Sequence, residues 1–219
     1  MDFYLINLNK RCFLYTEQNS KDIRRDPIGS LLKKLTKGNS WWKNLLRHLI
    51  RTIRNAYVRL EDKLDPMERV FKRMGHSKSL KLFCSARLED LEIIGKLNSL
   101  LLLQRRKHAI WLIIDTGLAI GALGLTPFLV PIPGPNVFLY FPALRAFSHY
   151  LACKGITNGL KIGSPTIIHS ERISSLEVLI LAGDSLSSKG RIFQLSRELG
   201  LENFTEFIGK YSSGKGNRK

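Results

Sequence analysis

Residues 109–140 form a nearly uninterrupted apolar stretch, in which Asp115 is the only charged residue. A soluble helix shows water a polar face every three or four residues, whereas residues 109–130 offer none. At about 1.5 Å of rise per residue these 22 residues make a helix of roughly 33 Å, enough to cross a hydrocarbon core of about 30 Å. The alternative is a buried central helix, which needs a larger core than the remaining sequence supplies. The stretch therefore predicts a membrane-embedded segment.

A second apolar stretch, residues 137–153, follows a break that is rich in proline. Proline lacks a donor N–H, so we expect the break to be the turn of a helical hairpin. The turn residues are Pro131, Pro133, Gly134, Pro135 and Asn136. Basic residues flank the hairpin: Arg105, Arg106 and Lys107 before it, and Lys154 after it. The positive-inside rule then puts both termini on the cytoplasmic or matrix side. A re-entrant loop that enters the membrane without crossing it is the alternative.

The formal net charge of +17 is unevenly distributed, with +13 in residues 1–108 and +4 in the rest. Such an excess implies an anionic partner, which is a lipid headgroup, RNA or an acidic protein. Because the basic region runs directly into the apolar hairpin, anionic lipid is the favoured partner. Other membrane proteins and self-association are further candidates.

An amphipathic helix is expected over residues 41–64, ending before Asp65-Pro66. One side of it carries a basic stripe: Lys43, Arg47, Arg51 and Arg54. The stripe is either a solvated face of a packed helix or a contact for lipid phosphates. A third interpretation is a membrane-anchored RNA- or ribosome-binding protein whose arginines contact phosphates.

Ionisable groups inside the apolar stretches are costly at bilayer depth, so they usually have a partner or a role. Counted from the turn, Asp115 lies about level with His149 and Lys154, whereas Arg145 lies nearer the tip. We therefore predict an Asp115–His149 or Asp115–Lys154 contact, with Arg145 satisfied separately by carbonyls or headgroups. The pair either handles protons or cations, since histidine titrates near neutral pH, or only locks the hairpin.

Enzyme signatures are missing from the sequence. It has neither a phosphate-binding GxxxxGK[ST] loop nor HExxH, and its five histidines show no metal-ligand spacing. Three scattered cysteines favour a reducing compartment over a disulfide scaffold. We expect no enzymatic activity, no cofactor, no metal and no cleaved leader.

The predicted fold is mainly α: a short N-terminal β-hairpin, amphipathic basic helices, a helical membrane hairpin and a small helical C-terminal region. The expected divisions are a β-hairpin at 1–20, a linker at 21–39, a basic helical region at 40–108, the membrane hairpin at 109–153, a linker at 154–173, C-terminal helices at 174–211 and a basic tail at 212–219.

Within the hairpin the sequence resembles the mitochondrial potassium–proton exchange related family, which has mitochondrial inner-membrane and bacterial members. The resemblance covers roughly residues 1–160. It is carried by Thr126-Pro127-Phe128-Leu129-Val130-Pro131, by Pro133, Pro135-Asn136-Val137 and Tyr140, and by Arg145-Ala146-Phe147-Ser148-His149 with Lys154-Gly155.

The resemblance implies a membrane protein concerned with monovalent cation and proton homeostasis, in a bacterial cytoplasmic or mitochondrial inner membrane. Two membrane segments cannot enclose a transport path unless several chains assemble, because transporters place their sites between repeats of several helices. We therefore expect an accessory or regulatory role, carried out with partners or as an oligomer.

Overall fold

A computed structural model describes residues 2–8, 11–17, 65–129, 137–182 and 186–212. The described elements belong to one compact unit, formed by residues 1–17 and 66–219. The predicted basic helix with Lys43, Arg47, Arg51 and Arg54, the linker before it, the predicted membrane turn and the basic tail from residue 213 onward lie outside the described residues.

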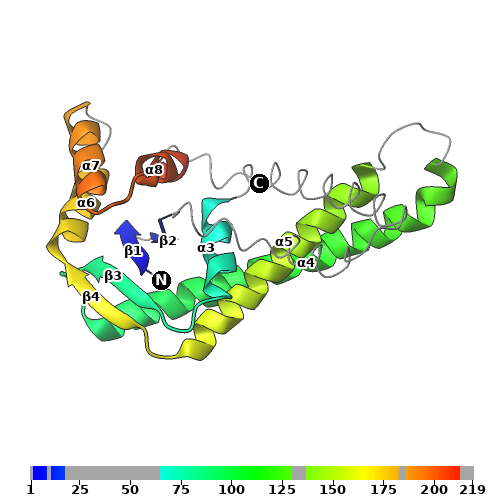
Figure 1. The fold of residues 1–219 in the computed structure, drawn as a ribbon, viewed down its shortest axis with the longest axis horizontal. Coiled ribbons are helices and arrows are strands. Elements are labelled where there is room, and N and C mark those ends of the chain that lie inside the picture. The colour runs from blue at the N-terminus through cyan, green and yellow to red at the C-terminus, as the bar shows by residue number, and fades with distance from the viewer. Residues whose placement is uncertain (1, 9–10, 18–64, 130–136, 183–185, 213–219) are drawn as a thin grey trace, which may run out of the picture. The chain divides into compact units, whose positions relative to one another are not determined.

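A four-stranded sheet organises this unit (Figure 1). β1 (Asp2–Leu8) and β2 (Arg11–Tyr15) pair antiparallel, with Leu5 opposite Leu14, which confirms the predicted N-terminal hairpin. The two strands β3 (Lys81–Ser85) and β4 (Thr166–Ser170) extend it in the order β2-β1-β3-β4, with β1, β3 and β4 parallel. A two-stranded hairpin is marginally stable alone, so β3 and the helices supply the packing it needs.

Six helices complete the described part of the chain: α3 (Pro66–Met74), α4 (Asp90–Leu129), α5 (Val137–Ile162), α6 (Glu171–Leu181), α7 (Leu186–Glu198) and α8 (Phe204–Ser212). The last three confirm the predicted C-terminal helices. Pro66 starts α3 in the first turn, where a missing N–H costs no intrahelical hydrogen bond, and α3 then buries Val70, Phe71 and Met74.

Two predicted divisions are wrong. Residues 40–108 are not wholly helical, because β3 interrupts them and α4 begins at Asp90. Residues 154–173 are not a linker, since they contain the end of α5, the strand β4 and the start of α6. Both strands have five residues, and their partner strands lie far away in the sequence, so local periodicity carries little sign of them.

The hydrophobic core lies where the sheet meets α3, the first half of α4 and the second half of α5. Phe3, Leu5, Phe71, Leu101 and Ile156 are each at most 1% exposed there. Beyond His108, α4 packs against α5, and most of its large apolar side chains are exposed. The long helix therefore belongs to the core at its start and to the apolar hairpin at its end.

α3 and α5 approach unusually closely at Gly155. A Cβ at this position would overlap the carbonyl oxygen of Phe71 and lie 2.7 Å from its carbonyl carbon. Only glycine allows the backbone of α3 to lie this near to α5. This contact fixes α3, and Glu68 on it, against the hairpin.

Candidate functional site

The facing surfaces of α4 and α5 bring together the ionisable residues of the apolar stretches. Asp115 Oδ2 lies 3.4 Å from His149 Nε2 and 3.5 Å from Arg145 Nε. Asp115 is 3% exposed and His149 is 5% exposed. The predicted Asp115–His149 contact is therefore present.

Two parts of the sequence prediction differ from the structure. Arg145 is not satisfied separately, because it shares the Asp115 carboxylate with His149. Residues 145 and 149 are one helical turn apart on the same face, and the long arginine side chain bridges the difference in depth. Lys154 is exposed, and no described contact joins it to Asp115.

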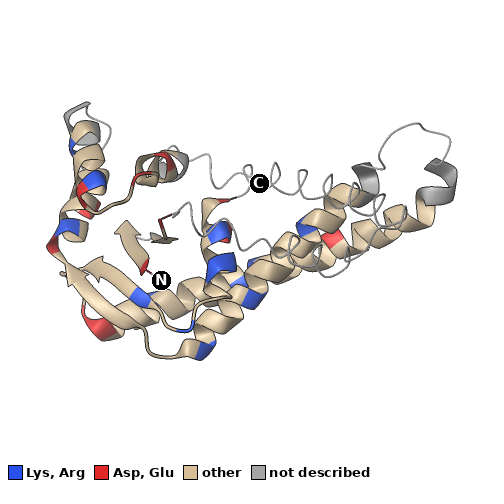
Figure 2. Ribbon diagram, viewed as in Figure 1, with Lys and Arg blue, Asp and Glu red and all other residues tan. Residues whose placement is uncertain are grey.

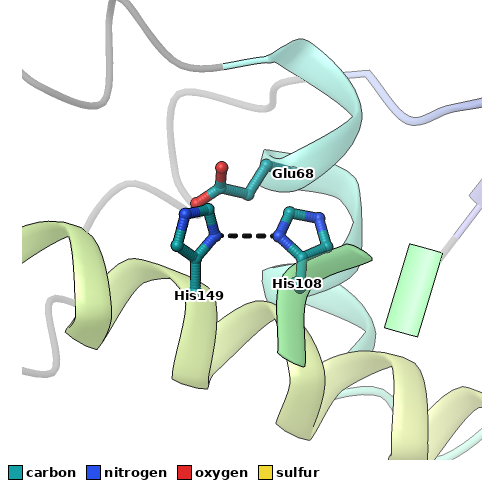
Figure 3. A group of neighbouring side chains, drawn as sticks. All are labelled: Glu68, His108 and His149. Carbon is teal, nitrogen blue, oxygen red and sulfur yellow. Dashed lines mark hydrogen bonds between the residues drawn. The ribbon is translucent and has the colours of Figure 1, made fainter. Parts of the chain in front are cut away.

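A second group adjoins the first through His149. His108 Nδ1 and His149 Nδ1 are 2.9 Å apart, and Glu68 on α3 points toward them (Figure 3). The Ser148 hydroxyl donates a hydrogen bond to Glu68 Oε1, and Lys72 Nζ lies 3.4 Å from the same oxygen. Glu68, His108 and Ser148 are all buried.

Protonation in this chain of groups is coupled by geometry. A carboxylate beside His149 Nε2 favours the proton on that nitrogen, which leaves His149 Nδ1 as an acceptor. His108 Nδ1–H can then donate to it across the 2.9 Å gap. Asp115 thus favours the tautomer in which His149 Nδ1 accepts from His108.

Aromatic rings surround the cluster. The Arg145 guanidinium lies 5.2 Å from the ring centroid of Trp111 and 5.9 Å from that of Phe141. The Trp111 ring is 6.5 Å from that of His149, and Phe71 covers His108 edge-on at 5.9 Å. Asp115 Oδ2, Arg145 Nε and His149 Nε2 are buried without a hydrogen bond of good geometry. The contact of the Asp115 carboxylate with the Arg145 guanidinium is therefore what offsets the desolvation of the carboxylate.

Three elements contribute one potential metal ligand each. Glu68 from α3, His108 from α4 and His149 from α5 are buried, and their ligand atoms lie within 4.8 Å of one another. These residues show no metal-ligand spacing in the sequence, because residues 108 and 149 meet only when α4 and α5 pack side by side.

The basic residues expected at lipid headgroups lie at the sheet end of the hairpin. Arg105, Arg106, Lys107 and Lys154 are exposed there. Figure 2 shows α4 without charged residues on the tip side of Asp115. The basic flanks of the hairpin therefore lie together at its sheet end, and the orientation of the hairpin in a membrane stays a prediction.

Glu68 and His108 are the site residues that the sequence reasoning missed. His108 directly follows the basic flank, and its spacing of seven residues from Asp115, which places both on one helix face, is the signal that could have found it. Glu68 gave no signal, because its approach depends on the contact between α3 and α5.

These features define a class of protein: a small α/β unit that carries an apolar helical hairpin with a buried ionisable cluster. The chain belongs to the mitochondrial K+-H+ exchange-related family, whose sequence model matches residues 3–161 and so includes the whole cluster. The resemblance noted in the sequence is thereby confirmed, and the name of the family suggests an involvement in potassium–proton exchange. Neither curated proteins nor solved structures show a match to this chain.

Proposed function

We propose that this chain is an integral membrane protein that assists or regulates potassium–proton exchange, acting with other membrane proteins or as an oligomer. The observation that carries the proposal is the exposed apolar surface of α4. The family supplies the link to potassium and protons, and its name points to a mitochondrial membrane.

Among the described residues one helical segment, Asp90–Leu125, is long and apolar enough to cross a bilayer. Length and composition are weak evidence alone, because the core helix of a soluble protein passes the same test. Low burial supports the membrane interpretation, since only 17% of the most apolar window is buried. Ile113 is 73% exposed, Ile120 66% and Leu123 60%. Contiguous apolar surface of this kind favours lipid or protein contact over water.

The arrangement of charge supports the same conclusion. Asp115, Arg145 and His149 turn toward one another between the helices, which lowers the cost of placing ionisable groups at bilayer depth. Basic side chains at the sheet end suit anionic headgroups on the matrix or cytoplasmic side. In this proposal the Asp115 cluster holds the two arms of the hairpin together.

An accessory role follows from the size of the hairpin. Two helices do not surround a path for ions, so exchange needs partner helices from other chains. The exposed apolar surface of α4 is available both to lipid and to such partners.

Ion flux in inner-membrane vesicles tests the proposal. Vesicles that lack the chain should lose potassium-driven proton flux, and wild-type chain should restore it. Asp115→Asn should restore it poorly, whereas Asp90→Asn, in the exposed Asp90–His169 pair, should restore it fully. Unchanged flux in vesicles without the chain would exclude the proposed function.

Purified chain in liposomes separates the accessory role from transport. We expect no potassium-driven proton flux from the chain alone. Flux from the purified chain, abolished by Asp115→Asn, would show that it is itself the exchanger and would overturn the accessory role.

A further inference from the structure

We propose that Glu68, His108 and His149 bind one divalent transition-metal ion, best fitted by Zn²⁺, at the junction of α3, α4 and α5. Nothing in the proposed function requires this site. It rests on the donor set, the burial and the geometry of the three side chains.

The distances suit a shared ion. The three ligand atoms lie within 4.8 Å of one another, and the two Nδ1 atoms are 2.9 Å apart. Zn–N bonds of about 2.0–2.1 Å in a tetrahedron separate two nitrogens by roughly 3.3 Å. The imidazoles would therefore need to part by about 0.4 Å, which small side-chain rotations provide.

The donor set selects the metal. Two imidazoles and one carboxylate suit Zn²⁺ and its first-row neighbours, whereas Ca²⁺ and Mg²⁺ prefer oxygen ligands alone. Three protein ligands leave a fourth position for water. An ion there would tie α3 to both arms of the hairpin.

Asp115 and Ser148, which contact two of the three ligands, are placed to orient them for metal binding. Ligating histidines usually direct their second nitrogen at a carboxylate or carbonyl, which fixes the tautomer. Asp115 Oδ2 lies 3.4 Å from His149 Nε2 and would hold the lone pair of His149 Nδ1 toward the ion. Ser148 donates to Glu68 and orients its carboxylate.

Lys72 opposes the ion. Its ammonium lies 3.4 Å from Glu68 Oε1 and competes with a cation for that oxygen. The carboxylate has a second oxygen, and the negative charges of Glu68 and Asp115 offset part of the added charge. A hydrogen bond between two neutral imidazoles is the alternative explanation of the 2.9 Å contact.

Trp111 provides a local probe, because its ring centroid is 6.5 Å from that of His149. The chain has three tryptophans, so Trp41→Phe with Trp42→Phe leaves Trp111 alone. The full chain, purified in detergent with a tag free of histidine, is stripped with chelator and titrated with Co²⁺. We expect quenching of Trp111 fluorescence that saturates at one Co²⁺ per chain and is reversed by Zn²⁺.

Variants locate the ion. Glu68→Gln, His108→Gln and His149→Gln should each abolish stoichiometric quenching, and Asp115→Asn should weaken binding about 10–100-fold. His169→Gln is the matched control, since His169 pairs with Asp90 at the surface and should leave binding unchanged. Helical circular dichroism of each variant shows that it is folded.

The single-tryptophan chain with all three ligands intact can by itself overturn the proposal. No saturable quenching by Co²⁺ in the folded single-tryptophan chain would show that the imidazoles only share a proton. Quenching that persists in the folded ligand variants would place the ion elsewhere, and this too would refute the site.

Discussion

Gly155→Ala tests the contact that holds α3 on the hairpin. The added Cβ would lie 2.7 Å from the carbonyl carbon of Phe71, whereas non-bonded carbons prefer about 3.5–4.0 Å. Because the Cβ would also overlap the carbonyl oxygen of Phe71, the two helices must move apart by more than about 1 Å. The opposing atoms belong to backbone and cannot rotate away, so the cost lies near the upper end of the roughly 1–3 kcal/mol typical of overpacking.

Helix propensity works in the opposite direction, because alanine in place of glycine stabilises a helix by about 1 kcal/mol. The net loss is then about 2 kcal/mol, which corresponds to a fall of roughly 4–8 °C in Tm for a chain of this size. Thermal unfolding of the purified chain in detergent, followed by helical circular dichroism, measures the shift.

Gly95→Ala is the matched control. Gly95 lies on the exposed side of α4, and a Cβ there meets nothing within 4 Å. This variant should gain about 1 kcal/mol of stability from helix propensity alone. If Gly155→Ala were as stable as Gly95→Ala, the close contact between α3 and α5 would be wrong.

Three further predictions concern buried groups. Asp115→Asn leaves the partly exposed Arg145 and the buried His149 beside a neutral amide. Because solvent still reaches the arginine, the cost should be about 1–3 kcal/mol, below the cost of breaking a fully buried pair. The exposed control Asp90→Asn should cost less than Asp115→Asn, about 1 kcal/mol or below, and equal unfolding midpoints would contradict the buried cluster. Burial raises the pKa of Glu177 above its ordinary value of 4.5, although a hydrogen bond from the backbone N–H of Asn7 acts to lower it. The folded chain therefore loses stability as the pH rises from 4.5 through the higher pKa of the folded state, because the buried side chain becomes charged. Glu177→Gln should therefore raise Tm at neutral pH, and the gain should shrink toward pH 4.5. A lower Tm of the variant at neutral pH would contradict this prediction. Burial raises the pKa of Cys84 to about 11, so this thiol should resist maleimide until the chain unfolds, as mass spectrometry of labelled peptides would show; rapid labelling of folded chain would contradict its burial.

Local patterns predicted the elements whose signals lie within one segment. The β-prone runs on either side of residues 9–10 predicted β1 and β2, and the apolar stretches predicted the facing helices α4 and α5. The strands β3 and β4 were missed because they pair with each other across more than 80 residues, with Lys81 opposite Thr166. Five-residue strands of this kind take their stability from partners that local periodicity does not reveal.

The candidate site was predictable to the same extent. Counting residues from the turn predicted the Asp115–His149 contact, because residues at equal distances from the turn lie side by side in two packed antiparallel helices. The same count kept Arg145 apart, since it ignored the length of that side chain. The position of Glu68 in the site could not be predicted from the sequence, because it depends on the close approach of α3 to α5 at Gly155.

Membrane extraction of the expressed chain measures the central claim most directly. Membranes are washed in high salt and then in alkaline carbonate, and the chain is followed in pellet and supernatant. Retention in the pellet through both washes is the predicted result, because the exposed apolar surface of α4 would be embedded in lipid. Release by salt alone would mean that basic side chains hold the protein at the surface, and the membrane-embedded hairpin would be refuted.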